Sequence, residues 1–536
     1  MLHQVTFLSS THNQILEIAP QENNVVIDCS LWISEFQSFD LVVDFDIEIE
    51  WFRNHDYTWV DIKQDRIATE FSPKILKLSN GFYVQANICY GIWEVNPKNP
   101  KQLLWRFNPE YSNPLTVYEG KNNAKVTKQA LSKFNFKQQP ILLFSSKDAL
   151  EFSRSKIPFS AVACFTDHCD FDTVHNLEIQ RNFFKEKNIK VTKGFFLNHF
   201  SKREDNASAE NNFAKILLWE NDGHELCYHS LSQSIKNEQE SFSDFKNGIS
   251  PYVNTTVWID HGFQPYNFSL FQNYNFQENE YEILLKNKGI KLLWNYIDSG
   301  SATLGIINQL NPNQFTLDTL WKGIKNESFF KVFQTMLKAI VFHFLNDDKT
   351  ITQYKLTALH FKKIIYQRQL KQISSFLKNI ILLSKAVSSA VFSWNSVKNT
   401  SFKLAKYTPL FFKHTIFKEE FIVFQTLEMI DFTSSLSKKN IDLLIKESGI
   451  FIAHTYFSDS ISYHSGKLIN NNQIDHQAAA NFDYVSEKIN QKQIWNPTLS
   501  QLYKYLQKLD EIVFDVDANG SIFVKNNTEL VTRKIV

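Results

Sequence analysis

Aspartate and histidine side chains gather at four places in the chain where an apolar run ends. These places are Ala161–His168, Asp222–Ser230, Trp258–Asn267 and Gly449–Thr455. Such residues are common ligands of divalent metals and common donors and acceptors of protons in hydrolases. A bound divalent metal activates water and polarises a carbonyl group, while a carboxylate serves as general base and an imidazole as general acid. The pattern therefore indicates metal-assisted hydrolysis.

The elements that must position these residues follow a strand–helix alternation that begins at Pro140. The apolar run Ala161–Phe165 predicts a strand, residues 177–188 have helical spacing, and residues 189–198 predict the next strand. This alternation is typical of βαβ units in a parallel sheet or barrel. In barrel enzymes the polar side chains at the carboxyl ends of several strands build one site. We therefore expect an α/β fold with a distorted (β/α) barrel.

The order and spacing of these segments resemble the motif series of the polysaccharide deacetylase (NodB-homology) family. Four matches carry the resemblance. The family's T-F-D-D is matched by Phe165-Thr-Asp-His168, its K-A-T-F-F strand by residues 189–198, its G-H-E-I-x-x-H-[ST]-x-x-H-[ST] by Gly223–Ser234, and its L-x-H by Ile452-Ala-His454. The likeness covers about residues 140–330 and 420–505, and it implies a barrel of the deacetylase type.

The resemblance also implies roles for individual residues. Asp167 falls on the position of the catalytic base, and His454 falls on that of the catalytic acid. His229 falls on the position of a metal-binding histidine. The family's third motif normally supplies an arginine that orients the base, but Asp260 and His261 occupy that region here. His261 could orient Asp167 or become a further metal ligand.

Two ligand positions depart from the family pattern. His168 stands where a ligand aspartate is usual, and Gln233 stands where the second ligand histidine is usual. Imidazole is a good ligand for zinc, whereas an amide is a poor one. We therefore expect a divalent metal, zinc, bound by His168 and His229 with help from Asp170 or Asp167. The alternative is a site that has lost its metal.

The remaining sequence predicts a multidomain chain. The hydrophobic fraction of 43% is ordinary for a globular protein. The segment 329–418 is helical in period and rich in lysine and phenylalanine. The predicted units are a β-rich N-terminal domain (1–120), a linker (121–139), the first part of the barrel (140–328), a basic α-helical insertion (329–418), the last part of the barrel (419–505) and a C-terminal β-hairpin (506–536).

Charge and cysteine content restrict the partners and the compartment. A net charge of +1 argues against nucleic-acid binding, which needs a basic footprint. The five cysteines are odd in number and scattered, and the N-terminal residues lack the pattern of a secretory signal, so we expect a cytoplasmic protein. The basic insertion could hold the protein at an anionic membrane surface, although lysine-rich faces are often only solvated.

The resemblance to polysaccharide deacetylases implies a metal-dependent hydrolase that removes an acetyl group from an N-acetylated sugar in a polysaccharide or glycan precursor. Trp258 and Tyr266 are the predicted sugar contacts, and His224 is predicted to be structural. Two alternatives stay open. The chain could hydrolyse another non-peptide C–N bond, or it could bind glycans without catalysis on a degenerate barrel.

Overall fold

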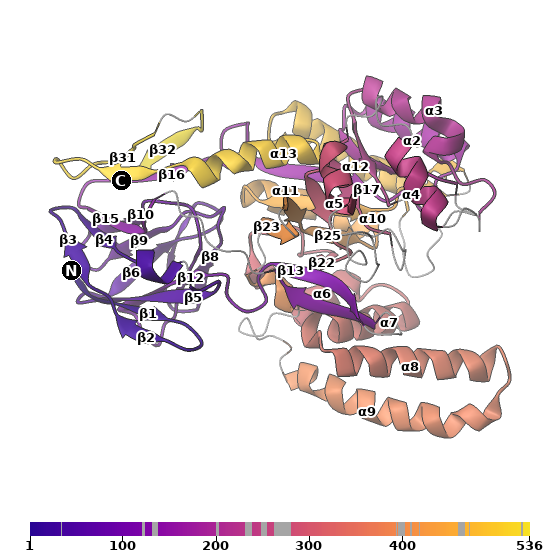
Figure 1. The fold of residues 1–536 in the computed structure, drawn as a ribbon, viewed down its shortest axis with the longest axis horizontal. Coiled ribbons are helices and arrows are strands. Elements are labelled where there is room, and N and C mark those ends of the chain that lie inside the picture. The colour runs from indigo at the N-terminus through magenta and orange to yellow at the C-terminus, as the bar shows by residue number, and fades with distance from the viewer. Residues whose placement is uncertain are drawn as a thin grey trace.

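The computed structural model is a mixed α/β protein with a β-sandwich at one end and a curled sheet with helices at the other (Figure 1). It describes residues 1–33, 35–119, 124–130, 138–199, 203–230, 238–247, 255–261, 280–392, 394, 402–407, 410–416, 419–458, 467–470, 472–526 and 529–536. The predicted fold class is thereby borne out at the level of an α/β architecture with a β-rich N-terminal domain and an α-helical insertion.

The N-terminal domain consists of two antiparallel sheets. One sheet has the order β2 (Asn13–Ile15), β1 (Leu2–Leu8), β5 (Phe39–Phe45), β12 (Gln102–Phe107), β11 (Ile92–Val95) and β8 (Arg66–Ala68). The other has the order β3 (Ile18–Pro20), β4 (Asn24–Ile27), β15 (Ile141–Ser145), β10 (Tyr83–Ala86), β9 (Ile75–Leu78), β6 (Ile49–Arg53) and β7 (Trp59–Asp61). Alternating apolar side chains fill the space between them, and Trp93 and Trp105 pack edge to face at 5.8 Å.

The boundary of this domain lies later in the chain than the sequence predicts. Strand β15 pairs with β4 and β10 of the sandwich, although the prediction assigned residues 140 onward to the barrel. Within the predicted linker, β14 (Ala124–Gln129) pairs with β13 (Pro114–Glu119). The apolar run of β15 fits a buried strand in either domain, and only its long-range pairing distinguishes them.

The second domain is built on a curled, mainly parallel sheet. Its order is β22 (Asp298–Ala302), β25 (Thr426–Met429), β26 (Ile450–Thr455), β17 (Ala161–Asp167), β18 (Val191–Phe195), β19 (Glu225–Tyr228), β20 (Val257–Ile259), β21 (Leu292–Trp294), β24 (Glu419–Phe424) and the antiparallel β23 (Phe411–Ile416). Strand β29 (Ile494–Trp495) also pairs with β17. Only Gln425 separates β24 from β25, so one bent segment joins two distant members of the sheet.

Helices cover the outer face of this sheet. They include α2 (Val174–Glu186), α3 (Ala209–Asn221), α4 (Glu238–Asn247), α5 (Glu280–Asn287), α6 (Leu317–Ile324), α10 (Phe432–Ser435), α11 (Lys438–Lys446) and α12 (His476–Asn490). Side chains alternate along β17, as in any strand. Ala163 and Phe165 pack on the helix side, whereas Val162 and Cys164 point into a second core formed by the opposite strand faces and α13 (Leu499–Leu506).

The helical insertion projects from the body of the second domain (Figure 1). It comprises α7 (Phe329–Ala339), the π-helical turn η3 (Ile340–Leu345), α8 (Asp348–Ile365), η4 (Leu370–Gln372), α9 (Ile373–Phe392) and η5 (Lys403–Ala405). Helices α8 and α9 form an antiparallel hairpin whose base contacts η3. No helix in the described part of the chain is long and apolar enough to cross a membrane.

The C-terminal segment returns to the sandwich. After α13 and η6 (Gln507–Glu511) come the predicted hairpin, β30 (Phe514–Val516) with β31 (Ile522–Val524), and then β32 (Thr532–Ile535). Strand β32 pairs with β16 (Ala149–Phe152) beside the N-terminal domain (Figure 1). A short ribbon, β27 (Ile469–Asn470) with β28 (Gln473–Ile474), precedes α12. Contacts between residues far apart in sequence thus tie the two domains together.

Candidate metal and proton-transfer site

Four of the imidazoles predicted from sequence meet at the carboxyl ends of neighbouring strands. His168 directly follows β17, and its ring stacks on that of His454 with centroids 3.8 Å apart. The centroid of the His229 ring, which follows β19, lies 4.7 Å from that of His168. His261, after β20, lies 5.0 Å from His229 by the same measure. The parallel register of these strands brings together residues nearly 300 positions apart in the chain.

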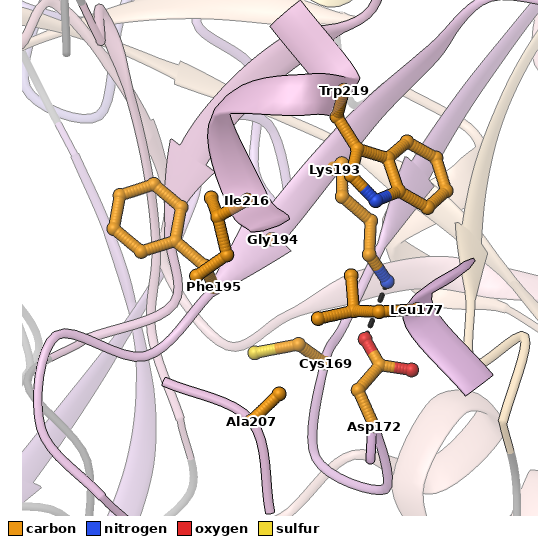
Figure 2. A pocket seen from close by; sticks show the side chains of 9 residues that line it. All are labelled: Cys169, Asp172, Leu177, Lys193, Gly194, Phe195, Ala207, Ile216 and Trp219. Carbon is orange, nitrogen blue, oxygen red and sulfur yellow. Dashed lines mark hydrogen bonds and ion pairs between the residues drawn. The ribbon is translucent and has the colours of Figure 1, made fainter. Parts of the chain in front are cut away.

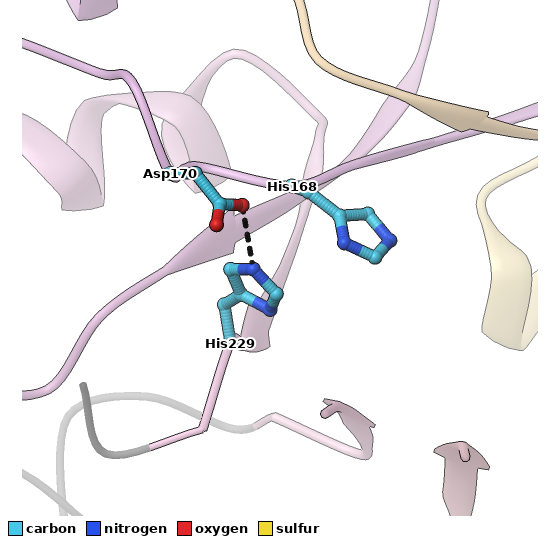
Figure 3. Close-up of side chains that lie close together, drawn as sticks. All are labelled: His168, Asp170 and His229. Carbon is cyan, nitrogen blue, oxygen red and sulfur yellow. Dashed lines mark hydrogen bonds and ion pairs between the residues drawn. The ribbon is translucent and has the colours of Figure 1, made fainter. Parts of the chain in front are cut away.

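His168, Asp170 and His229 offer three ligand atoms that all lie within 4.8 Å of one another (Figure 3). Both histidines are buried and Asp170 is partly buried. Nε2 of His168 is buried without a hydrogen-bond partner in the described part of the chain. Two imidazoles and a carboxylate form a donor set suited to zinc and similar divalent metals. The residues present therefore fit a divalent metal, and they are the three ligands predicted from sequence.

The contacts of His229 suit a metal ligand. Its Nδ1 lies 3.2 Å from the backbone carbonyl of Ile259, an acceptor that requires Nδ1 to carry a proton. In a neutral ring Nε2 then carries no proton. Its lone pair faces the carboxylate oxygen Oδ2 of Asp170 at 2.9 Å, and the two atoms repel each other. A proton or a cation between these two atoms removes the repulsion. Metal-binding histidines commonly donate their second N–H to a backbone carbonyl in this way.

His261 also contacts Asp170. Its Nε2 lies 2.5 Å from Oδ1, so the carboxylate lies between two imidazoles. Burial alone would raise the pKa of Asp170, but His261 and His229 hold it well below its usual range. The sequence left two roles open for His261, namely orienting Asp167 or acting as a further metal ligand. In the structure His261 contacts Asp170, a candidate metal ligand. The described contacts of Asp167 do not include His261.

Burial and neighbouring imidazoles keep the two proposed histidine ligands uncharged. Burial lowers the pKa of His168 well below its ordinary value, and the adjacent His454 and His229 lower it further. Burial also lowers the pKa of His229, although Asp170 opposes the shift. A metal binds the deprotonated nitrogen of imidazole, so a low pKa reduces competition from protons. Both histidines are therefore ready to bind a cation at neutral pH.

Asp167, the predicted base, lies apart from this cluster. Like Ala163 and Phe165, it points to the helix side of β17. Its carboxylate forms an ion pair with Lys193 of β18. The other oxygen accepts the backbone N–H of Phe457 at 3.1 Å. His168, one residue later, faces the opposite side of the strand. The alternation of a regular strand thus separates two residues that the motif comparison treats as one site.

Lys193 also contacts Asp172 Oδ2 at 2.5 Å, and its ammonium lies 5.2 Å from the Trp219 ring centre (Figure 2). Asp167, Asp172 and Lys193, which we call the buried ion-pair cluster, are all at most 2% exposed. Burial raises the pKa of Asp167 to about 7, with Lys193 lowering it and Asp172 raising it. Lys193 is a charge partner of Asp167 that the sequence comparison did not identify. It stands one position before Gly194, whose backbone lies against the Asp167 carbonyl.

Asp298 is a second residue that the sequence analysis missed. Both of its carboxylate oxygens lie 3.0 Å from Nδ1 of His454, and Thr426 Oγ1 donates to Oδ1 at 2.5 Å. Trp294 Nε1 donates to the same hydroxyl at 2.8 Å. These bonds fix the orientation of the His454 ring. An aspartate at the start of a strand is a weak signal in sequence, because no residue near Asp298 in the chain indicates that His454 is its partner.

The predicted sugar contacts have different positions. Trp258 is fully buried on the helix side of β20, between Tyr228 and Phe245, so it is a core residue out of reach of a sugar. Its Nε1 donates to Asp260 Oδ1 at 3.0 Å, and this hydrogen bond fixes the buried Asp260 carboxylate at the end of β20. Tyr266 lies outside the described residues.

His224, predicted to be structural, accepts the backbone N–H of Val191 through Nδ1 at 3.2 Å. Burial lowers the pKa of His224 to about 4, below its value of 6.5 in an unfolded chain. Below pH 6.5 the unfolded state therefore binds a proton that the folded state does not. We expect the free energy of unfolding to fall by roughly 3 kcal/mol between pH 6.5 and 4 from this residue alone.

Urea denaturation at several pH values measures this effect. A His224→Gln variant should lose that part of the pH dependence, whereas an exposed control, His175→Gln, should keep it. An unchanged pH slope in His224→Gln would assign the acid sensitivity to other groups.

No known protein-family model matches this chain, and a search of the curated proteins found no match. What the site can do therefore follows from its own residues. They provide three closely spaced ligand atoms and, beside them, an imidazole fixed by a carboxylate. This combination suits binding of a divalent cation together with proton transfer.

Proposed function

We propose that the protein is a metal-dependent hydrolase that removes an acetyl group from an N-acetylated sugar, on a barrel of the polysaccharide deacetylase type. The observation that carries the proposal is the adjacency of the His168–Asp170–His229 set to the His454–Asp298 pair. The motif order in the sequence supports the same reaction class. Neither feature alone specifies a deacetylase, but together they supply cation binding and proton transfer within one buried site.

His168, Asp170 and His229 would hold the metal, which we take to be zinc. When bound, such an ion lowers the pKa of a water ligand and polarises an amide carbonyl. His261 contacts the outer oxygen of Asp170 and keeps this carboxylate in place. The low pKa values of His168 and His229 keep their nitrogens available to a cation at neutral pH.

His454 would move the protons of the reaction. Because Nδ1 donates to Asp298, the proposed proton transfer would take place at Nε2, the other ring nitrogen. We assign to it both the uptake of a proton from the attacking water and its delivery to the leaving amine. Asp167 acts instead through structure, because Lys193 and the backbone of Phe457 occupy its carboxylate.

Metal content of the purified protein is the direct test. We expect near-stoichiometric zinc or another divalent transition metal, and its loss in a His168→Ala, His229→Ala double variant. The matched control is His175→Ala, His476→Ala, which removes two exposed histidines and should leave the metal content unchanged. Absence of metal after reconstitution with zinc, manganese or cobalt salts would overturn the metal-hydrolase proposal.

A substrate screen then separates the candidate reactions. Release of acetate from N-acetylated amino-sugar oligomers supports the deacetylase, whereas turnover only of other linear or cyclic amides indicates a different C–N hydrolase. Binding of glycans by a protein that holds no metal and releases no acetate would favour the non-catalytic alternative.

A further inference from the structure

The hairpin of α8 and α9 exposes an unusual number of large apolar side chains. Tyr366 is 77% exposed and Leu370 is 69% exposed, and both lie where the two helices turn. Eight further large apolar side chains of the two helices are also exposed, namely Leu356, Leu359, Phe361, Ile365, Ile373, Leu377, Ile381 and Leu382. An exposed apolar cluster such as the one at the turn normally marks a contact with a membrane or another molecule.

Of these side chains, Phe361 also helps to hold the hairpin together. The two helices are joined by the Phe361–Phe376 ring contact at 5.9 Å and by a hydrogen bond from Gln353 to Asn379 at 2.5 Å. His360 Nδ1 lies 2.9 Å from Gln372 Oε1 near the turn. Gln353, His360 and Phe376 thus face the neighbouring helix, whereas large apolar side chains at the turn are exposed. A surface hairpin normally exposes polar side chains instead.

The charge of the hairpin is strongly one-sided. After Asp348 at the start of α8, no Asp or Glu occurs before Glu419. Over the rest of α8, the turn and α9 the charged residues are all basic, namely Lys349, Lys355, Lys362, Lys363, Arg368, Lys371, Lys378 and Lys385. All of these are exposed except the half-buried Lys363. Exposed apolar side chains interleaved with lysine and arginine are typical of segments that bind the interface of an anionic membrane.

The position of the hairpin suits such a contact. Helix α8 has 18 residues and is therefore about 27 Å long. The hairpin leaves the body of the protein at η3, and its turn lies at the free end (Figure 1). The turn can therefore enter a lipid interface while the curled sheet stays in water. Neither helix is long and apolar enough to span the bilayer.

We propose that the turn of the α8–α9 hairpin inserts into an anionic membrane surface and holds the protein there as a peripheral protein. The apolar anchor is Ile365, Tyr366, Leu370 and Ile373, and the surrounding Lys362, Lys363, Arg368 and Lys371 contact anionic headgroups. Charge complementarity selects lipid over a second copy of the chain, because two basic hairpins repel each other. This inference does not depend on the proposed hydrolysis.

Co-sedimentation of the full chain with vesicles tests the proposal. We expect binding to phosphatidylcholine vesicles that contain phosphatidylglycerol, little binding to pure phosphatidylcholine, and weakening of binding by salt. Each basic residue near an anionic surface strengthens binding by about fivefold. The variant Lys362→Gln, Lys363→Gln, Arg368→Gln, Lys371→Gln should therefore bind at least about tenfold more weakly.

A matched control removes the same charge elsewhere. Lys98→Gln, Lys147→Gln, Lys438→Gln, Lys439→Gln changes four exposed lysines outside the hairpin and should bind as the unaltered protein does. A second variant, Tyr366→Ser with Leu370→Ser, tests insertion and should bind anionic vesicles several-fold more weakly with an unchanged melting temperature. Metal content of each variant should match that of the unaltered protein.

Three results would overturn the proposal. They are failure of the unaltered protein to bind anionic vesicles, equal weakening by the control variant, and full binding by the Tyr366→Ser, Leu370→Ser variant. Sedimentation of the protein without vesicles tests the alternative that a second copy of the chain contacts this surface. An oligomer that dissociates in the Tyr366→Ser, Leu370→Ser variant, in a protein that ignores vesicles, would assign the hairpin to self-association.

Discussion

Replacing Lys193 with methionine is expected to lower the free energy of unfolding by about 3–5 kcal/mol. Methionine is unbranched and of similar length to the apolar stem of lysine. The substitution removes the only cation that contacts both Asp167 and Asp172 in the described part of the chain. Two carboxylates would then stay buried between β17, β18 and the covering helices without a compensating charge. Denaturant unfolding at neutral pH measures the loss.

The pH dependence of this loss has a definite sign. Burial already raises the pKa of Asp167 to about 7 in the folded protein, above its value of 3.8 in an unfolded chain. A raised carboxyl pKa means that the folded state binds the proton more tightly, so its contribution to stability falls as pH rises from about 4 to 7. Without Lys193 the pKa rises further. The Lys193→Met defect should therefore be smaller at about pH 5 than at about pH 8.

Lys185 supplies the control for this experiment. Its ammonium contacts Asp222 at 2.7 Å, but its side chain is 60% exposed. Lys185→Met should cost less than about 1 kcal/mol, because water screens an exposed pair. A triple variant that adds Asp167→Asn and Asp172→Asn to Lys193→Met should recover part of the lost stability. Equal unfolding of Lys193→Met and the unaltered protein would contradict the buried ion-pair cluster.

The closeness of His168 and His229, two of the proposed metal ligands, could be predicted from sequence because strand geometry fixes their meeting place. His168 and His229 each follow an apolar strand, and the carboxyl ends of parallel strands lie at one edge of a sheet. The same reasoning brought His454 to the site from the far end of the chain. The basic helical segment was also recognisable, because its helical period and missing acidic residues are local properties.

The position of Asp167 depends on the alternation of side chains along the same strand. Ala161, Ala163 and Phe165 share one face with it, and a period of two places His168 on the other face. The motif comparison gave the two neighbours one site, although a strand that stays regular to its last residue separates them. Here the parallel pairing of Asp167 with Lys193 and Thr455 keeps the strand regular to its end.

Other features depend on contacts that leave no local trace. Asp298 contacts His454 across 156 positions of sequence, and β16 pairs with β32 at the opposite end of the chain. The assignment of β15 to the sandwich is of the same kind. Hydrophobic pattern gives the type of each element, but it does not specify which distant strand or side chain becomes its partner.

The largest catalytic effect is expected at His454. On the proposed mechanism, His454→Gln lowers kcat for acetate release by about 10²–10⁴-fold, the usual contribution of a positioned proton donor or acceptor. Metal content should stay unchanged, because His454 lies beside the three ligands and is not one of them. KM should change little, since the imidazole is proposed to act on protons rather than to bind the sugar.

Asp298→Asn provides the matching test of orientation. The amide keeps the shape of the carboxylate but removes the negative charge that favours a protonated His454 ring. A smaller fall in kcat is expected, together with a shift of the acidic limb of the pH–rate profile to lower pH, because the ring must start unprotonated to accept a proton from water. His414→Gln, which alters a half-buried histidine on β23, should leave both the rate and the profile unchanged. Full activity of His454→Gln with bound metal would remove this pair from the chemistry, and proton transfer would then pass to another group such as His261.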